Sequence, residues 1–96
     1  MDIKASTEGS VTTLTLEGWL DTNSVSAFAD ELDTIDDTCT ELVLDFANLE
    51  YISSSGLRQV VAAWKKMGGN LRVINVKPDV RQVFHMAGFD QRLNIS

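Results

Sequence analysis

The sequence predicts an α/β fold with a mixed, mostly parallel sheet and helices mainly on one face. Strand and helix signals alternate in the order β-β-α-β-α-β-α-(β), an N-terminal β-hairpin whose second strand begins a βαβαβα series. The chain has 96 residues, of which 44% are hydrophobic and 23% charged, a composition typical of one globular core. It has no repeat or linker, so we expect one domain over residues 1–96.

The first two strands are predicted from their residue patterns. Residues 2–7 alternate between polar and apolar, and residues 11–20 are rich in Thr, Val and Leu. Residues 8–10 (Glu-Gly-Ser) suit a tight turn, so the two strands should pair as an antiparallel hairpin. Gly18 indicates a bend or a close backbone approach near the end of the second strand.

Three helices are predicted, each from an apolar stripe at helical spacing. The stripes are Val25, Phe28, Ala29 and Leu32; then Leu57, Val60, Val61 and Trp64; then Val80, Val83, Phe84 and Ala87. Residues 21–24 offer four N-caps for the first helix, and an acidic loop at residues 34–40 follows it. A glycine pair at residues 68–69 ends the second helix, and Pro78 begins the third.

The remaining strands are predicted at residues 42–46 and 71–76, and residues 93–95 suit a short last one. The first of these runs is mostly apolar, as in a strand covered on both faces. Right-handed crossovers would place the strands after the hairpin in parallel neighbour order. The loops at residues 21–24 and 53–56 then follow the carboxyl ends of adjacent strands, so we expect them to be neighbours in space.

Charge and cysteine content exclude several function classes. The formal net charge of −6 argues against nucleic acid and anionic membranes as partners, because both need clustered Lys and Arg. No apolar run is long enough for membrane insertion, and no signal peptide follows Met1. The single Cys39 has no companion at metal-ligand spacing and suits a reducing compartment. We therefore expect a cytoplasmic protein that needs neither a metal nor another cofactor.

The run Ser53-Ser54-Ser55-Gly56 lies where a buried strand gives way to a helix. One hydroxyl is enough to cap the helix, so one or two of the three remain for another role. The run does not fit the Gly-x-Ser-x-Gly pattern of hydrolases, and it lacks the Lys and glycines of a phosphate-binding loop. The only histidine, His85, has no obvious orienting Asp. We therefore predict no catalytic residues and no enzymatic activity.

Three stretches of the chain match motifs of a known family. Residues 51–58 are similar to its Asp-Ser-Ser/Thr/Ala-Gly-Leu turn, residues 18–22 to its Gly-x-Leu-Asp, and residues 84–89 to its Phe-x-x-x-Gly-Phe/Leu. Together they resemble the STAS domain, most closely the anti-sigma factor antagonists, over nearly the whole chain. The family's phosphorylated serine follows the Asp of the motif, so it corresponds to Ser54. Ser53 replaces that Asp with a neutral residue.

The resemblance implies a binding module that sequesters an anti-sigma factor, usually a serine kinase, and is switched off by phosphorylation of Ser54. A serine phosphatase would reverse the modification, and we expect a monomer or weak dimer. The residues that we assign to partner binding are Asp21, Thr22, Asn23, Ser53, Ser55, Gly56 and Arg58. The alternative is a STAS scaffold subunit of a transporter or stress-signalling complex without a phospho-switch.

Simpler roles stay open for several of these residues. Ser54 and Ser55 could serve only as a helix cap, Asp21 as a capping or surface carboxylate, and Arg58 as part of a solvated helix face. Trp19, beside the same loops, is either a core residue or an exposed anchor of the kind enriched at interfaces. The sequence does not choose between these two roles for Trp19.

Overall fold

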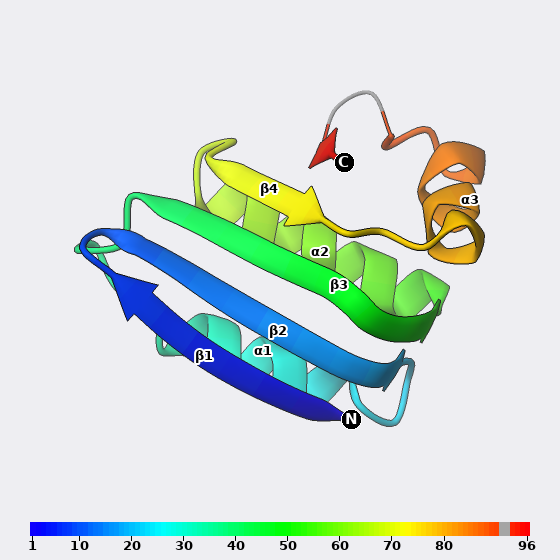
Figure 1. Ribbon diagram of the computed structural model, residues 1–96, viewed down its shortest axis with the longest axis horizontal. Helices are drawn as coiled ribbons and strands as arrows, with labels where there is room; N and C mark the ends of the chain where they lie inside the picture. Colours follow the sequence, from blue (N-terminus) through cyan, green and yellow to red (C-terminus); the bar gives the residue numbers. More distant parts are fainter. Residues whose placement is uncertain (91–92) are drawn as a thin grey trace.

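The computed structural model describes residues 1–90 and 93–96, which form a five-stranded sheet with three helices (Figure 1). The strands are β1 (Asp2–Glu8), β2 (Val11–Leu20), β3 (Glu41–Ile52), β4 (Leu71–Ile74) and β5 (Asn94–Ile95), and the helices are α1 (Val25–Asp33), α2 (Ser54–Lys66) and α3 (Pro78–Met86). The strand order is β1-β2-β3-β4-β5. Among the described strands only β1 and β2 pair antiparallel, so the predicted mixed, mostly parallel sheet is confirmed.

The N-terminal hairpin forms as predicted. Glu8 pairs with Val11 across the turn, and Gly9 adopts a φ of 62°, which a side chain would disfavour. The predicted irregularity at Gly18 is also present. Its φ is 99°, and the pairing of β2 with β3 shifts register between Gly18 and Trp19.

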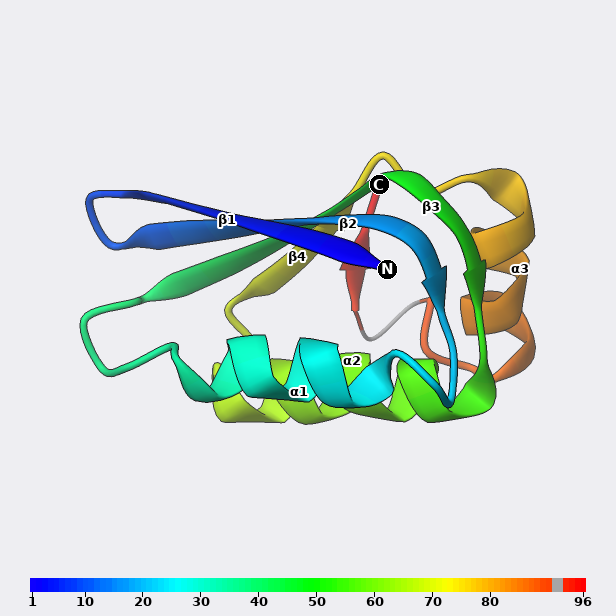
Figure 2. The ribbon, with the colours of Figure 1, turned by 90° about the horizontal axis from the view of Figure 1, so that it is seen from below.

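The core lies between the sheet and the helix pair α1 and α2, which cover one face (Figure 2). The residues of β2 and β3 that point into it are Leu14, Leu16, Leu20, Leu42, Leu44 and Phe46. Phe28 of α1 and Val60 of α2 are fully buried against them. Helix α3 lies at the end of the sheet, where the ring of Phe84 is 6.3 Å from that of Phe46 (Figure 2). The helices are therefore mainly on one face, as predicted.

The prediction that residues 42–46 are covered on both faces is wrong. In the described part of the chain, no helix covers the second face of β3 (Figure 2), yet Val43 on that face is only 4% exposed. Its neighbours across the sheet are Thr13 and Arg72, whose side chains flank it. A long Arg stem covers apolar surface in this way, so a buried outer residue does not require a second layer.

Two strand boundaries also differ from the predicted ones. Strand β3 runs to Ile52 rather than to residue 46, because its pairing with β2 continues to the end through two register shifts. Strand β4 ends at Ile74 rather than at residue 76, because Asn75 adopts a left-handed φ of 57°. The short last strand pairs with β4, as predicted.

The helix stripes are buried less completely than their spacing suggests. Leu57 and Val60 of α2 are buried, whereas Val61 and Trp64 are half-buried. In α3, Ala87 falls just after the helix and is exposed. The reason is that α2 contacts the sheet with one side only, so the edge of its stripe stays at the surface.

Candidate functional site

The loop between β3 and α2 gives each of its three serines a different environment. Ser53 has an extended backbone and is the N-cap of α2, because its Oγ accepts a hydrogen bond from the Gly56 amide at 3.1 Å. Its own amide donates to the Leu20 carbonyl at 2.9 Å. Ser53 therefore starts the helix and ties the loop to the end of β2.

Ser55 links the two loops at this end of the sheet. Its Oγ lies 2.9 Å from that of Ser53 and 3.2 Å from the hydroxyl of Thr22, which follows β2. Thr22 and Ser55 are 33 positions apart in the sequence. The contact confirms the predicted proximity of the loops at residues 21–24 and 53–56.

Ser54 is the first residue of α2, and its side chain is exposed. Within residues 1–90 and 93–96, no side-chain hydrogen bond involves its hydroxyl, in contrast to the hydroxyls of Ser53 and Ser55. The capping role that the sequence left open for all three serines thus belongs to Ser53. Of the three serines, Ser54 is the one with an exposed side chain.

Gly56 has a structural role and is buried. A Cβ at this position would lie 2.6 Å from the Leu20 carbonyl oxygen, closer than a real Cβ approaches any atom. The missing side chain lets α2 begin against the end of β2. Gly56 thus shapes the loop, and its assignment to partner binding stays a prediction.

The loop after β2 is held by its own side chains. Asp21 Oδ1 accepts hydrogen bonds from the amides of Asn23 at 3.0 Å and Ser24 at 3.1 Å, which is an Asx turn. The Ser24 hydroxyl donates to the Trp19 carbonyl at 2.6 Å and does not cap α1. The Asp21 carboxylate therefore stabilises the turn, while Thr22 and Asn23 are the exposed residues of this loop.

An exposed aromatic pair lies beside these loops. Trp19 and Tyr51 are register partners on β2 and β3, and their ring centroids are 5.3 Å apart. Trp19 is 57% exposed and Tyr51 is 45% exposed, so Trp19 is a surface residue and not part of the core. Sequence reasoning did not include Tyr51 in the site. The strand predicted at residues 42–46 ends before Tyr51, and two register shifts precede its pairing with Trp19, so the sequence held no signal that joined the two rings.

A groove of about 490 Å³ extends along the outer side of α2, starting at Ser54. The residues that line it are Ser54, Leu57, Arg58, Val61, Ala62, Lys65, Ala87 and Phe89. Arg58 is exposed, as in the solvated face that the sequence allowed, but it borders an apolar floor. The segment after α3 closes the groove, and no local pattern in the sequence could have revealed that contact.

The statement that His85 has no orienting Asp is wrong. His85 Nδ1 lies 2.8 Å from Asp90 Oδ2, and this hydrogen bond lowers the pKa of Asp90 from its ordinary value. The histidine side chain is 65% exposed. Among the residues that the structure describes, no Ser or Cys hydrogen-bonds to it, and no three His, Cys, Asp or Glu side chains gather as metal ligands. The His85–Asp90 pair thus has no nucleophile beside it among the described residues.

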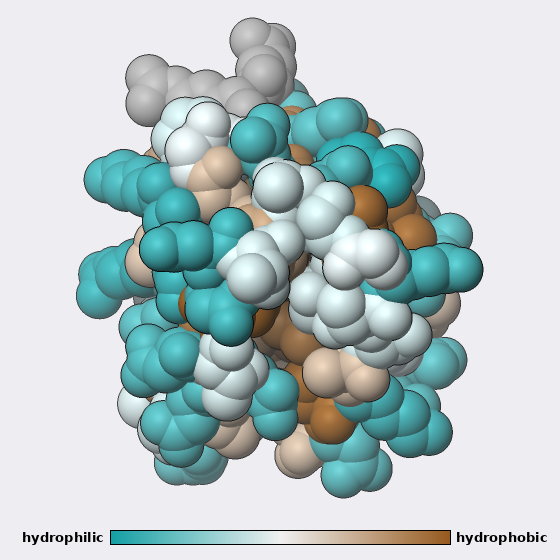
Figure 3. Space-filling view, turned by 90° about the vertical axis from the view of Figure 1, so that its left-hand side faces the viewer, coloured by the Kyte–Doolittle hydropathy of each residue, from teal (hydrophilic) through white to brown (hydrophobic). Residues whose placement is uncertain are grey.

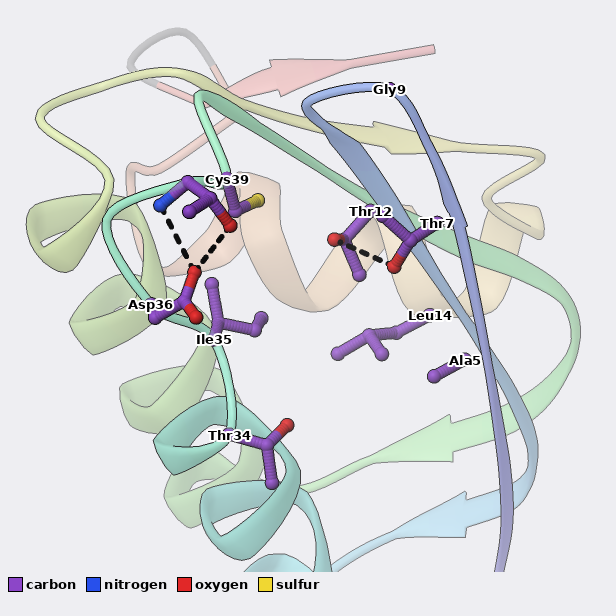
Figure 4. Close-up of a pocket in the computed structure, with 10 residues that line it drawn as sticks. Ala5, Thr7, Gly9, Thr12, Leu14, Thr34, Ile35, Asp36 and Cys39 are labelled. Atoms are coloured by element: carbon purple, nitrogen blue, oxygen red, sulfur yellow. Dashed lines mark hydrogen bonds between the residues drawn. The ribbon is translucent and has the colours of Figure 1, made fainter.

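A second hollow lies at the opposite end of the sheet. Figure 3 shows an apolar floor beneath a polar rim, and Figure 4 shows the hollow between the hairpin and the loop after α1. Its volume is about 200 Å³. Its hydroxyls bond within the protein: Thr7 pairs with Thr12 at 3.2 Å, and Thr38 donates to Asp36, which lowers the pKa of that carboxyl. The Cys39 thiol donates to the Glu41 carbonyl.

The fold and the serine loop together define a small α/β domain with an exposed hydroxyl at the first turn of a helix. The chain belongs to the STAS family, since the family model described as "Mlab, STAS domain" matches residues 3–95. A relative from Bordetella bronchiseptica, named as the anti-sigma factor antagonist BtrV, is 45% identical over 51 residues. That alignment covers 50% of this chain and 44% of the relative, so the chain matches less than half of that protein's length.

Solved structures share the fold at low sequence identity. The unphosphorylated anti-sigma factor antagonist SpoIIAA is 21% identical with a TM-score of 0.85, covering 99% of this chain and 88% of that chain. The phosphorylated form of Bacillus SpoIIAA is 20% identical with a TM-score of 0.76, over 99% and 91%. A sulfate transporter family protein from Wolinella succinogenes is 17% identical with a TM-score of 0.75, over 88% and 72%. At these identities the likeness concerns the fold alone.

Across the described part of the chain, no helix is long and apolar enough to cross a membrane.

Proposed function

We propose that this protein is a cytoplasmic anti-sigma factor antagonist that sequesters an anti-sigma factor with serine kinase activity. Phosphorylation of Ser54 switches it off, and a serine phosphatase restores it. The observation that carries the proposal is the unbonded, exposed hydroxyl of Ser54 at the family's modified position. The STAS fold and the relative named as an anti-sigma factor antagonist support it.

Ser53 can replace the family's Asp without loss of the loop geometry. Its hydroxyl caps α2 at the Gly56 amide, which is the bond that a capping carboxylate would accept. The neutral residue also leaves one less negative charge beside Ser54. Modification of Ser54 therefore does not need an Asp to hold the loop open.

A phosphate on Ser54 would leave the fold intact. It adds about −1.5 to −2 charges at the N-terminus of α2, where the helix dipole stabilises an anion by about 0.3–1 kcal/mol. Inactivation must then come from the interface, because a bulky dianion at the contact surface has to be desolvated at a cost when the partner binds. A loss of roughly 3–4 kcal/mol would weaken binding by about two to three decades.

The test begins with a pull-down from the native lysate by wild type, Ser54→Ala and Ser54→Asp. We expect wild type and Ser54→Ala to recover a kinase-like anti-sigma factor and Ser54→Asp to recover less of it. Partner affinity and melting temperature are then compared for the unmodified and phosphorylated proteins. Unchanged affinity after phosphorylation would refute the switch, and an affinity loss matched by a large drop in melting temperature would refute the interface mechanism.

The alternative is a constitutive STAS scaffold in a transporter complex. The observation behind this second function is the fold shared with a sulfate transporter family protein, a likeness of the fold alone. The same pull-down decides between the two functions. Recovery of transporter subunits, unaffected by either change at Ser54, would support the scaffold and contradict the switch.

A further inference from the structure

The groove along α2 combines an apolar floor with two unpaired cations. Leu57, Val61 and Phe89 provide buried or half-buried apolar surface, and Arg58 and Lys65 border it. Within residues 1–90 and 93–96, neither cation belongs to an ion pair, whereas Arg72 pairs with Glu41. The two positive charges of the groove are therefore available to a ligand.

The charge of this helix is opposite to that of the chain. The whole sequence has 14 Asp and Glu residues against 8 Lys and Arg residues. Helix α2 carries Arg58, Lys65 and Lys66 but neither Asp nor Glu. Lys66 donates to the Leu32 carbonyl of α1, so the charges that face outward along the groove are those of Arg58 and Lys65. None of the described residues that line the groove is acidic.

We propose that this groove binds an acidic amphipathic helix of the anti-sigma partner. Apolar side chains at i, i+3, i+4 and i+7 of that helix would cover Leu57, Val61 and Phe89, and its Glu or Asp residues would face Arg58 and Lys65. The charge complementarity selects this occupant, because a basic segment would meet two like charges. The inference rests on the function proposed above and specifies the chemistry of its partner.

The position of Ser54 at one end of the groove links the occupant to the switch. A phosphate there would repel the acidic side chains of the bound helix. Arg58 lies four residues after Ser54 on the same helix, which is the spacing at which side chains of α-helices pair. The phosphate would therefore also draw the Arg58 guanidinium away from the groove.

The test uses two synthetic peptides of about 16 residues, long enough for some helix in solution. Both have the same Leu stripe, and one has Glu and the other Lys at the flanking positions. Fluorescence anisotropy measures binding to the full chain, and amide chemical shifts locate it. We expect the Glu peptide to bind about tenfold more tightly than the Lys peptide, with shifts at Leu57, Val61 and Phe89.

Matched variants separate the groove from the net charge. Arg58→Glu and Lys65→Glu should each weaken binding of the Glu peptide about tenfold, whereas Lys4→Glu makes the same charge change on β1 and should have little effect. Ala62→Trp should fill the groove and abolish binding. Ala27→Trp places the same bulk on an exposed position of α1 and should leave binding of the Glu peptide unchanged.

Several outcomes would overturn the proposal. They are equal affinity for the two peptides, no binding of the Glu peptide at about 1 mM, or chemical shifts outside the groove. Flotation with phosphatidylglycerol vesicles that depends on Arg58 and Lys65, without binding of the Glu peptide, would assign the groove to anionic lipid instead.

The anti-sigma factor recovered in the pull-down distinguishes failure of the groove from failure of the switch. If Ser54→Asp weakens its binding but Arg58→Glu and Lys65→Glu behave like Lys4→Glu, the groove proposal is wrong and the switch remains. If the two groove variants weaken its binding and neither Ser54→Asp nor phosphorylation does, the groove remains and the proposed switch is wrong.

Discussion

Replacing Gly56 by Ala should destabilise the protein, although Ala favours helix. The added Cβ would lie 2.6 Å from the Leu20 carbonyl oxygen and 2.9 Å from Leu20 Cγ. That carbonyl accepts the Ser53 amide at 2.9 Å, so moving it away would also strain the bond between the loop and β2. Overpacking lowers the free energy of unfolding by about 1–3 kcal/mol, and the higher helix propensity of Ala offsets up to about 1 kcal/mol of this loss.

The closest contact is with a backbone oxygen, which cannot rotate away, so the cost lies in the upper half of this range and the net loss for Gly56→Ala is about 1–2 kcal/mol. This loss corresponds to a melting temperature roughly 4–16 °C lower in a domain of this size. Thermal unfolding followed by circular dichroism measures it. Ser54→Ala is the matched control, because this neighbouring position in the first turn is exposed and should melt at or slightly above the wild-type temperature. A melting temperature of Gly56→Ala at or above wild type would refute the close approach of α2 to β2.

Three further predictions concern the cap, the acid dependence and catalysis. Ser53→Ala removes the cap of α2 and should lower the free energy of unfolding by about 1 kcal/mol. Ser53→Asp keeps a capping oxygen and should be at least as stable as wild type. Urea unfolding measures both, and equal stability of the three proteins would contradict the cap. The folded state lowers the pKa of Asp90 below its ordinary value of 3.8, so the ionised carboxylate stabilises the fold at any pH above 3.8. This stabilisation is lost as the pH falls through the lower pKa of the folded state. Asp90→Asn should therefore be less stable than wild type at pH 7, with the gap closing in acid; a gap independent of pH would exclude this origin. Purified wild type should hydrolyse p-nitrophenyl acetate no faster than Ser54→Ala, and a turnover that this variant abolishes would reveal a catalytic serine.

The elements of the fold followed from local patterns. The turn at Gly9 and Pro78 at the first position of α3 are short-range signals, and the structure has both. Boundaries were less predictable where pairing overrides propensity. The residues after Phe46 include Asn48 and Glu50, which disfavour strands, yet β3 continues through them because β2 pairs with it along its whole length.

The location of the candidate site was predictable from the sequence, but the role of each residue in it was not. The serine run identified the loop, and the order of parallel strands predicted its neighbour at residues 21–24. Asp21 and Gly56 turned out to hold the loops in shape, by an Asx turn and by a close backbone approach. Both roles depend on distances of a few ångströms, which residue types alone do not determine.

The sequence by itself determined the order of strands and helices, the strand-to-helix turn with three hydroxyls, and the acidic character of the chain. The tertiary structure decided that Ser53 caps, that Ser55 binds Thr22, and that Ser54 stays free. It also exposed Trp19 and brought Phe89 beside α2 to form the groove. The physical reason is that periodicity and capping act within a few residues of the chain, whereas exposure and hydrogen bonding depend on neighbours that only folding brings together.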